Sequence, residues 1–160
     1  MLRRAVPADS PAIARIWQRG WLDGHRGDVP DALIAVRTPE SFRIRAAERV
    51  GDAVVAVVAG AVAGFVMVVG DEVEQVYVDA AHRGRGVAGE LLAEAERLVA
   101  AAGHRQAWLA VVPGNARARR FYERSGWVDQ GQFENHAAYA GGTIAVPCRR
   151  YVKRVDIPPS

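Results

Sequence analysis

The stretch from Gln75 to Val99 constrains the fold most, because it joins a short apolar strand to a helix through a turn rich in glycine and arginine. β-Branched and aromatic residues predict the strand over Glu72–Val78, and the turn follows over Asp79–Gly86. The helix begins around residues 86–88. Its apolar residues recur every three or four positions, as expected of one buried face; they are Leu91, Leu92, Ala95, Leu98 and Val99. Because a helix N-terminus presents unpaired amides and the positive end of the helix dipole, the stretch predicts a phosphate site.

Residues 84–89, Gly-Arg-Gly-Val-Ala-Gly, satisfy the Gly-x-Gly-x-x-Gly pattern of dinucleotide-binding loops. In that class of site an acidic residue at the end of the next strand binds a ribose hydroxyl. The next strand here, Gln106–Val112, is followed by Pro113-Gly114-Asn115 and by no acid. The dinucleotide interpretation is therefore disfavoured. A loop that only turns the chain is the remaining alternative without a ligand.

The periodicity of the whole chain predicts seven strands and four helices. The strands are expected at Leu2–Val6, Ala53–Ala59, Ala61–Val69, Glu72–Val78, Gln106–Val112, Trp127–Phe133 and Ile144–Val155. The helices are expected over residues 9–20, 38–49, 86–102 and 115–125. Strands 53–78 form an antiparallel meander. Its second and third strands are nearly continuously apolar, which indicates cover on both faces. Strand 106–112 runs parallel to strand 72–78. Residues 21–36 are expected to be a loop with about one helical turn, and residues 134–142 a second loop.

Two motifs in this order resemble the GNAT superfamily of N-acetyltransferases. Arg83, Gly86 and Ala88 fit the Arg-x-x-Gly-x-Ala loop that binds the pyrophosphate of acetyl-coenzyme A in that family. The family's second hallmark, Asn-x-x-Ala-x-x-x-Tyr-Glu-x-x-Gly-Phe, is matched at Asn115, Ala118, Tyr122, Glu123 and Gly126, with Trp127 in place of Phe. The resemblance covers essentially the whole chain. It implies an α/β domain of the α+β type over residues 1–155, with a mixed, mostly antiparallel central sheet of about six or seven strands flanked by about four helices. Residues 156–160 are expected to form a disordered tail.

The resemblance implies that acetyl-CoA is the co-substrate and that no metal takes part. The end of strand 72–78 offers backbone groups to the pantetheine arm, and the loop and helix start hold the pyrophosphate. The implied coenzyme-binding residues are Val76, Tyr77, Val78, Arg83, Gly84, Arg85, Gly86, Val87, Ala88, Gly89 and Asn115. Asn115 has a second interpretation as a helix cap.

Acetyl transfer to an amine requires that the amine lose a proton, and the departing thiolate benefits from gaining one. By resemblance, Tyr122 protonates the thiolate. Glu72 and Glu74 share one face of their strand, and Glu74 occupies a position where several relatives keep an acid, so Glu74 is the candidate general base. Some relatives need no dedicated base. Three residues of the variable segments are candidates for binding the amine: Trp21, His25 and Tyr139.

The expected function is transfer of an acetyl group to a primary amine of a small molecule, by direct attack in a ternary complex. The alternatives are acetylation of a protein N-terminus or lysine and, from another class, a non-catalytic acyl-CoA-binding module.

Composition bears on the partners. The net charge is +3, but no basic run with interleaved aromatics indicates a nucleic-acid surface. The scattered histidines show no metal-ligand spacing. The sequence contains no signal peptide and no apolar run long enough to span a membrane, so a membrane partner is not expected. Cys148 is the only cysteine, which favours a reducing, cytoplasmic location. A homodimer is left open.

Overall fold

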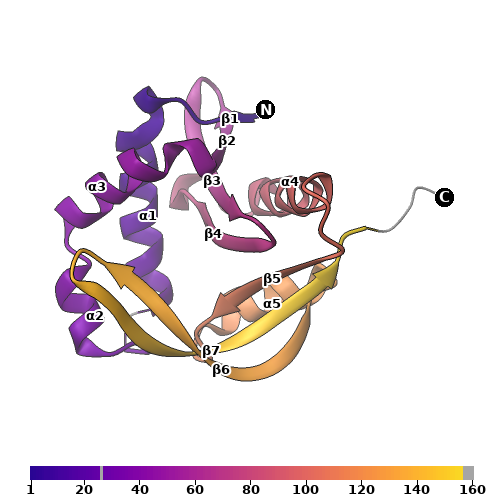
Figure 1. The fold of residues 1–160 in the computed structure, drawn as a ribbon. Coiled ribbons are helices and arrows are strands. Elements are labelled where there is room, and N and C mark those ends of the chain that lie inside the picture. Colours follow the sequence, from indigo (N-terminus) through magenta and orange to yellow (C-terminus); the bar gives the residue numbers. More distant parts are fainter. Residues whose placement is uncertain (26, 157–160) are drawn as a thin grey trace.

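A single seven-stranded sheet forms the centre of the molecule, with strand order β1-β2-β3-β4-β5-β7-β6 (Figure 1). The computed structural model describes residues 1–25 and 27–156. The strands are β1 (Leu2–Arg4), β2 (Ala53–Val58), β3 (Ala61–Val69), β4 (Glu72–Val78), β5 (Gln106–Val111), β6 (Val128–Tyr139) and β7 (Gly142–Arg154). Neighbouring strands are antiparallel except β4 and β5, which are parallel as predicted.

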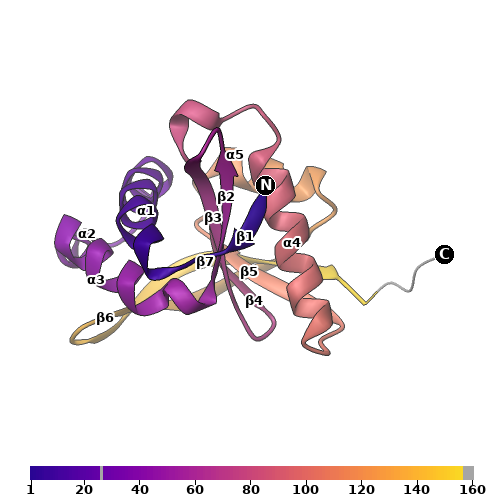
Figure 2. The same ribbon diagram turned by 90° about the horizontal axis from the view of Figure 1, so that it is seen from above.

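Five α-helices cover the two faces of this sheet (Figure 2). They are α1 (Ser10–His25), α2 (Asp31–Val36), α3 (Pro39–Arg49), α4 (Val87–Ala101) and α5 (Ala116–Arg124). One core cluster joins α1, α2 and α3 to the sheet, and a second joins α4 and α5 to the opposite face. Strand β3 contributes Phe65 and Met67 to the first cluster and Val66 to the second, against which Val68 also packs. The predicted cover on both faces of the meander is therefore confirmed.

The prediction that residues 21–36 form a loop is wrong for most of the segment. Helix α1 continues through Gly20 and Gly24 to His25, and α2 forms a further short helix. Neither glycine ends the helix. Instead, each lies where a side chain of another element packs closely against the helix. A Cβ built on Gly20 would lie 2.3 Å from Cδ1 of Tyr77, and one on Gly24 would lie 2.9 Å from Nδ2 of Asn115. These glycines serve close packing rather than chain termination.

The prediction of a loop over residues 134–142 is also wrong. Strands β6 and β7 continue as a long antiparallel hairpin, with Tyr139 paired to Gly142 at its tip. Apart from Tyr139, residues 134–143 are polar or small, so this part of the hairpin lacks the apolar run that marked the inner strands. Of the expected tail, residues 157–160 lie outside the described residues.

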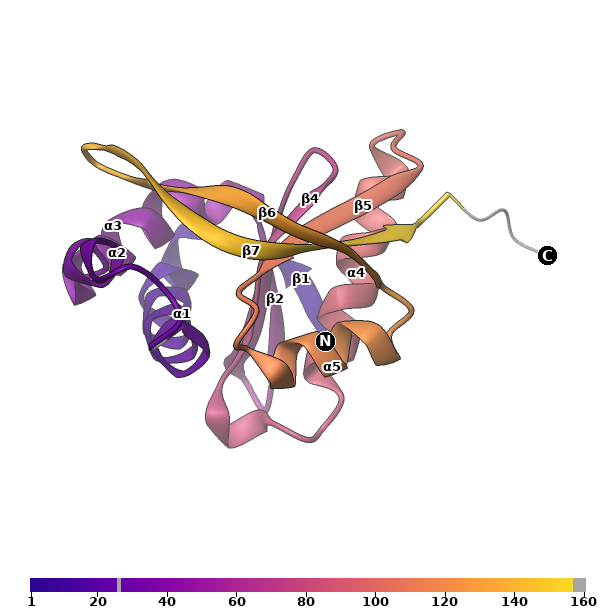
Figure 3. The same ribbon diagram turned by 90° about the horizontal axis from the view of Figure 1, so that it is seen from below.

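Strands β4 and β5 separate soon after they meet. Glu72 and Trp108 are the one ladder pair between them among the residues described. The Trp108 amide donates to the Asp71 carbonyl at 3.0 Å, and the Trp108 indole N–H donates to the Asp71 carboxylate at 3.1 Å. Beyond this point the two strands diverge (Figure 1), as the view from below also shows (Figure 3). The sheet is thus opened at its centre.

Candidate functional site

A cleft of about 890 Å³ lies where β4 and β5 diverge. Its walls come from both strands, from helices α1, α2, α3 and α5, and from the tip of the β6–β7 hairpin. Eight of the predicted site residues line it: Trp21, His25, Glu74, Val76, Tyr77, Asn115, Tyr122 and Tyr139. Residues far apart in the sequence, on the four elements α1, β4, α5 and β6 or their ends, are therefore brought to one cavity.

The other predicted coenzyme residues lie at the end of β4 and the start of α4. Val78 and Arg83 border a small hollow together with Arg15 and Arg19 of α1. Arg83 also donates a hydrogen bond to Asp23 at 3.3 Å, which ties the glycine-rich loop to α1. Gly84 to Gly89 form the turn and the first turn of α4. The predicted residues thus form a continuous path from the cleft, along the end of β4, to this helix.

The N-terminus of α4 has the features of an anion site. Gly86 is the N-cap and Gly84 precedes it, with φ angles of +80° and +77° that favour glycine. The first helical hydrogen bond runs from the Glu90 amide to the Gly86 carbonyl at 3.1 Å. The amides of residues 87–89 precede that bond and have no intrahelical acceptor. Since Gly86 has no side chain to cap them, these amides are free to bind a phosphate.

Gly89 supports the same interpretation independently. It lies inside α4 in ordinary helical geometry, and a Cβ built on it would meet no atom within 4 Å. Glycine in a helix costs about 1 kcal/mol relative to alanine, and nothing in the surrounding chain requires it here. Close approach of a ligand to the backbone would account for it.

Tyr122 lies on the inner side of α5 at the cleft. Its ring centroid is 6.3 Å from that of Trp127 and 6.1 Å from that of Tyr151. Burial raises the pKa of Tyr122 to about 12. The phenol therefore keeps its proton at neutral pH, and that proton is available to a group that gains negative charge nearby.

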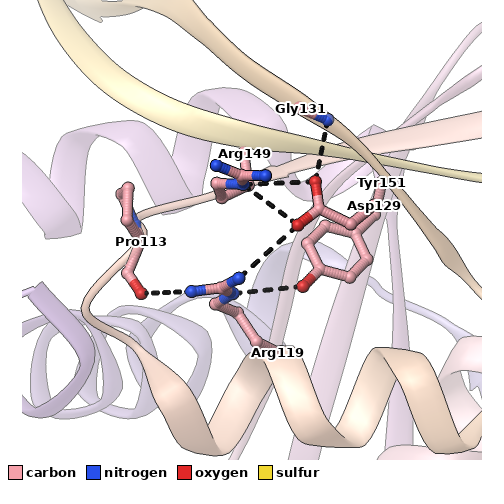
Figure 4. Close-up of polar contacts among 6 residues, drawn as sticks. All are labelled: Pro113, Arg119, Asp129, Gly131, Arg149 and Tyr151. Carbon is pink, nitrogen blue, oxygen red and sulfur yellow. Dashed lines mark hydrogen bonds and ion pairs between the residues drawn. The ribbon is translucent and has the colours of Figure 1, made fainter.

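Arg119 makes a set of polar contacts around Tyr151 (Figure 4), and the Tyr151 ring is a neighbour of the Tyr122 ring. It donates to the Tyr151 hydroxyl at 3.1 Å and to the Pro113 carbonyl at 2.9 Å, and it reaches the Asp129 carboxylate at 3.5 Å. Arg149 donates to the same carboxylate from β7. Arg119 thus links α5 to the end of β5 and to the closing hairpin.

Asn115 caps α5: its side-chain oxygen accepts a hydrogen bond from the Ala118 amide at 3.2 Å. The capping interpretation is therefore confirmed. Its amide nitrogen lies against Gly24 of α1.

The two acids of β4 have different surroundings. Arg49 of α3 donates to both oxygens of Glu74, at 3.0 and 2.9 Å. Within residues 1–25 and 27–156, no arginine donates a hydrogen bond to the Glu72 carboxylate. Burial, followed by the charges of Glu74 and Asp71, raises the pKa of Glu72 to about 7. Of these two acids, Glu72 is the one poised to exchange a proton near neutral pH.

His25 closes α1 and stacks on Trp21, with ring centroids 5.0 Å apart. Its Nδ1 donates to the Trp21 carbonyl at 2.9 Å, since a carbonyl can only accept. Burial lowers the pKa of His25, which favours the neutral ring with its lone pair on Nε2.

Three arginines in the cleft were not singled out from the sequence: Arg37, Arg45 and Arg49. Arg45 and Arg49 are four residues apart on the predicted helix and so share a face. That spacing did not stand out, because almost all the cationic residues of the chain are arginines.

Two findings concern other classes of site. Within residues 1–25 and 27–156, no group of three or more His, Cys, Asp or Glu side chains is placed to hold a metal ion. No helix in the same ranges combines the length and apolar character needed to cross a membrane.

Comparisons with known proteins agree with this geometry. A search of curated proteins gave no match. Among solved structures, a GCN5-related N-acetyltransferase from Rhodopseudomonas palustris is 21% identical with a TM-score of 0.73, covering 96% of this chain and 94% of that one. YncA from Salmonella typhimurium, solved with its cofactor acetyl-CoA, is 21% identical with a TM-score of 0.69, covering 100% and 96%.

A phosphinothricin acetyltransferase from Sinorhizobium meliloti, in complex with acetyl-CoA, is 22% identical with a TM-score of 0.68, covering 96% of this chain and 87% of that one. These likenesses show a shared fold. The model of the acetyltransferase (GNAT) family matches residues 12–127, well over half of the chain. The protein therefore belongs to the acetyltransferase (GNAT) family and is an acyltransferase.

Proposed function

We propose that the protein transfers the acetyl group of acetyl-CoA to the primary amine of a small molecule, within a single domain of residues 1–155. One observation carries the proposal: Val76 and Tyr77 line the cleft at the β4–β5 opening, and the chain leads from Val78, at the end of the same strand, through the glycine-rich loop to the amides at the start of α4. This arrangement suits a long ligand with a reactive end and a diphosphate end. Structural relatives from two organisms were solved with acetyl-CoA.

The residues present fit the coenzyme. The edge of β4 at Val76, Tyr77 and Val78 is left without a β5 partner, so that its backbone groups can bind the amide-bearing pantetheine arm. The amides of residues 87–89 would bind the pyrophosphate, with Arg83 and Arg85 adding positive charge. When bound, acetyl-CoA supplies an acetyl group activated as a thioester.

Two side chains would move the protons. We propose that Glu72, rather than the Arg49-bound Glu74, accepts the proton that the ammonium of the acceptor must lose. Tyr122 would hold its phenolic proton toward the sulfur that leaves. In the balanced reaction, R–NH₃⁺ and acetyl-CoA give R–NH–CO–CH₃, CoA–SH and H⁺.

A small acceptor is favoured by the walls of the cleft. Helix α2 and the tip of the β6–β7 hairpin both contribute to its lining, so the acceptor side is bounded by several elements. The phosphinothricin acetyltransferase among the relatives is named for a small molecule. The single thiol, Cys148, is buried and free, which suits a cytoplasmic location.

A ligand-binding measurement tests the coenzyme part of the proposal. Acetyl-CoA at a hundredfold excess over its Kd should stabilise the protein by about 2.7 kcal/mol, whereas NAD should not. A shift with NAD alone would contradict the proposal. Thiol release in the presence of small amines, but not of peptides, would support the acceptor class. Binding of acetyl-CoA without turnover on any amine would instead favour a non-catalytic binding module.

A further inference from the structure

We propose that the amine acceptor carries a carboxylate, which Arg37 and Arg45 bind in the cleft. The acceptor class is then an amino acid, free or modified on its side chain. This inference rests on the proposed acetyl transfer and narrows its acceptor.

Arg37 is the first basis for the inference. It ends α2 and is only 7% exposed, yet it lines the cleft. Its Nε and Nη1 atoms are buried, and within residues 1–25 and 27–156 no group accepts a hydrogen bond from either. Burial lowers the pKa of this guanidinium. A buried charge without an acceptor is costly, so a site of this kind is built for a ligand that supplies one.

Arg45 presents a second cation to the same cleft. Its guanidinium carbon lies 4.2 Å from the centroid of the Trp17 ring, so the ring fixes its plane. Nη1 of Arg45 is also buried, and no group among the described residues accepts a hydrogen bond from it. Burial, followed by the charges of Arg37 and Arg49, lowers its pKa to about 10. The cations are therefore close enough to repel one another.

Among residues 1–25 and 27–156, carboxylates form ion pairs with Arg49, through Glu74 and Asp52, and with neither of the other two arginines. Two planar guanidiniums without carboxylate partners match the geometry and charge of a carboxylate, which accepts paired hydrogen bonds from such donors. The same charges would repel a polyamine or any acceptor whose second group is cationic.

The position of the pair relates it to the transfer site. Burial raises the pKa of the Tyr77 hydroxyl, and the charges of Arg45 and Arg37 act in the opposite direction on it. Tyr122 lines the same cleft. Tyr77 stands at the β4 edge proposed to hold the pantetheine arm. Glu72 lies on the same strand, so one wall of the cleft offers acids to an ammonium while α2 and α3 offer cations to a carboxylate. An α-amino acid carries both groups.

The wild-type protein gives the first test. Thiol release is measured with the twenty L-amino acids and with their α-carboxamides, each pair sharing one side chain. We expect kcat/KM for the preferred acid to exceed that for its amide by about 100-fold or more, because the amide leaves the buried guanidiniums without an anion. The amine of the amide has the lower pKa, so intrinsic reactivity would favour the amide. Equal rates, or a preference for the amide or for polyamines, would overturn the inference.

Variants locate the effect. Arg37→Gln and Arg45→Gln should each lower kcat/KM for the acid by about 10- to 100-fold and change that for the amide little. Arg37→Lys should recover part of the loss. Arg43→Gln, at an exposed position on α3 outside the cleft, is the matched control and should change neither substrate. Equal losses for acid and amide would contradict carboxylate binding, and if Arg37→Gln does not fold, Arg45→Gln and the wild-type selectivity decide.

A binding measurement separates this inference from the proposed function. Calorimetry with CoA present should show the N-acetyl amino acid binding to the wild type, and binding weakened by Arg45→Gln, while the Kd of acetyl-CoA stays unchanged. If acetyl-CoA binds and only neutral or cationic amines are acetylated, the inference fails and the proposed function stands. If acetyl-CoA does not bind, both fail.

Discussion

Arg49 donates two hydrogen bonds to the carboxylate of Glu74, one to each oxygen, at 3.0 and 2.9 Å. This pair crosses from α3 to β4 and fixes the acid that the sequence favoured as a base. Glu72, two residues earlier on the strand, is left as the carboxyl group with the raised pKa. The pairing thus gives different surroundings to two acids that share one face of their strand.

Substitution of Glu72 should alter the pH dependence of the reaction. A base works only when deprotonated, so kcat/KM of the wild type should rise as the pH rises through about 7. Glu72→Gln should remove this limb and lower kcat/KM at pH 8 by about 100-fold. Glu74→Gln should retain the limb, because Glu72 remains. A limb that disappears only in Glu74→Gln would return the role of base to Glu74.

Tyr122→Phe should leave the Kd of acetyl-CoA unchanged and lower kcat by about 100-fold, since it removes one hydroxyl that donates a proton. Isothermal titration and single-turnover kinetics measure the two effects separately. Trp127→Phe, a neighbour of the Tyr122 ring, controls for loss of packing. If turnover is the same with and without the hydroxyl, Tyr122 has no part in the proton transfer.

Substitution by alanine at Gly86 and at Gly89, at the start of α4, should change the stability of the protein in opposite directions. Gly86→Ala places a Cβ at a φ of +80°, which should lower the free energy of unfolding by about 1 kcal/mol. Gly89→Ala should raise it by about 0.5–1 kcal/mol, because alanine is the better helix former and no neighbour obstructs it. Urea unfolding without ligand measures both. Destabilisation by Gly89→Ala would mean that the protein itself requires this glycine.

Gly20→Ala tests the close contact between α1 and β4. Helix propensity alone predicts stabilisation, but the new Cβ would lie 2.3 Å from the Tyr77 ring. Overpacking of this kind costs about 1–3 kcal/mol, so the midpoint of urea unfolding should fall. Gly89→Ala serves as the helical control without a neighbour, and a rise in the midpoint for both variants would show that the Tyr77 ring can move aside.

The sequence was most informative where a pattern has a single physical cause. The Gly84–Gly86 turn, the α4 stripe and the apolar run of β3 follow from local rules, and their predictions agree with the structure. The extent of α1 was missed because a glycine that ends a helix and one that admits a neighbouring ring look alike until the neighbour is known. Gly20 is of the second kind.

The site was predictable in part for the same reason. Motifs placed Tyr122 and the start of α4, and the structure brings the segments of Trp21 and Tyr139 to the same cleft. The ion pair of Arg49 with Glu74 and the unpaired state of Arg37 depend on how α2 and α3 lie against β4. Such pairings are long-range, and no spacing along the chain specifies them.

Among the described residues, Glu72 and Trp108 form the one ladder pair between β4 and β5. The sheet is therefore weakly joined at its centre. Backbone amides that face the opening, from residues 76–78 and 110–112, lack a rung on the opposite strand and should exchange deuterium faster than their neighbours. A ligand that fills the opening would supply those rungs. Acetyl-CoA should therefore slow deuterium exchange at residues 76–78 and at residues 110–112 together, because the bound coenzyme would take the place of an additional strand between β4 and β5.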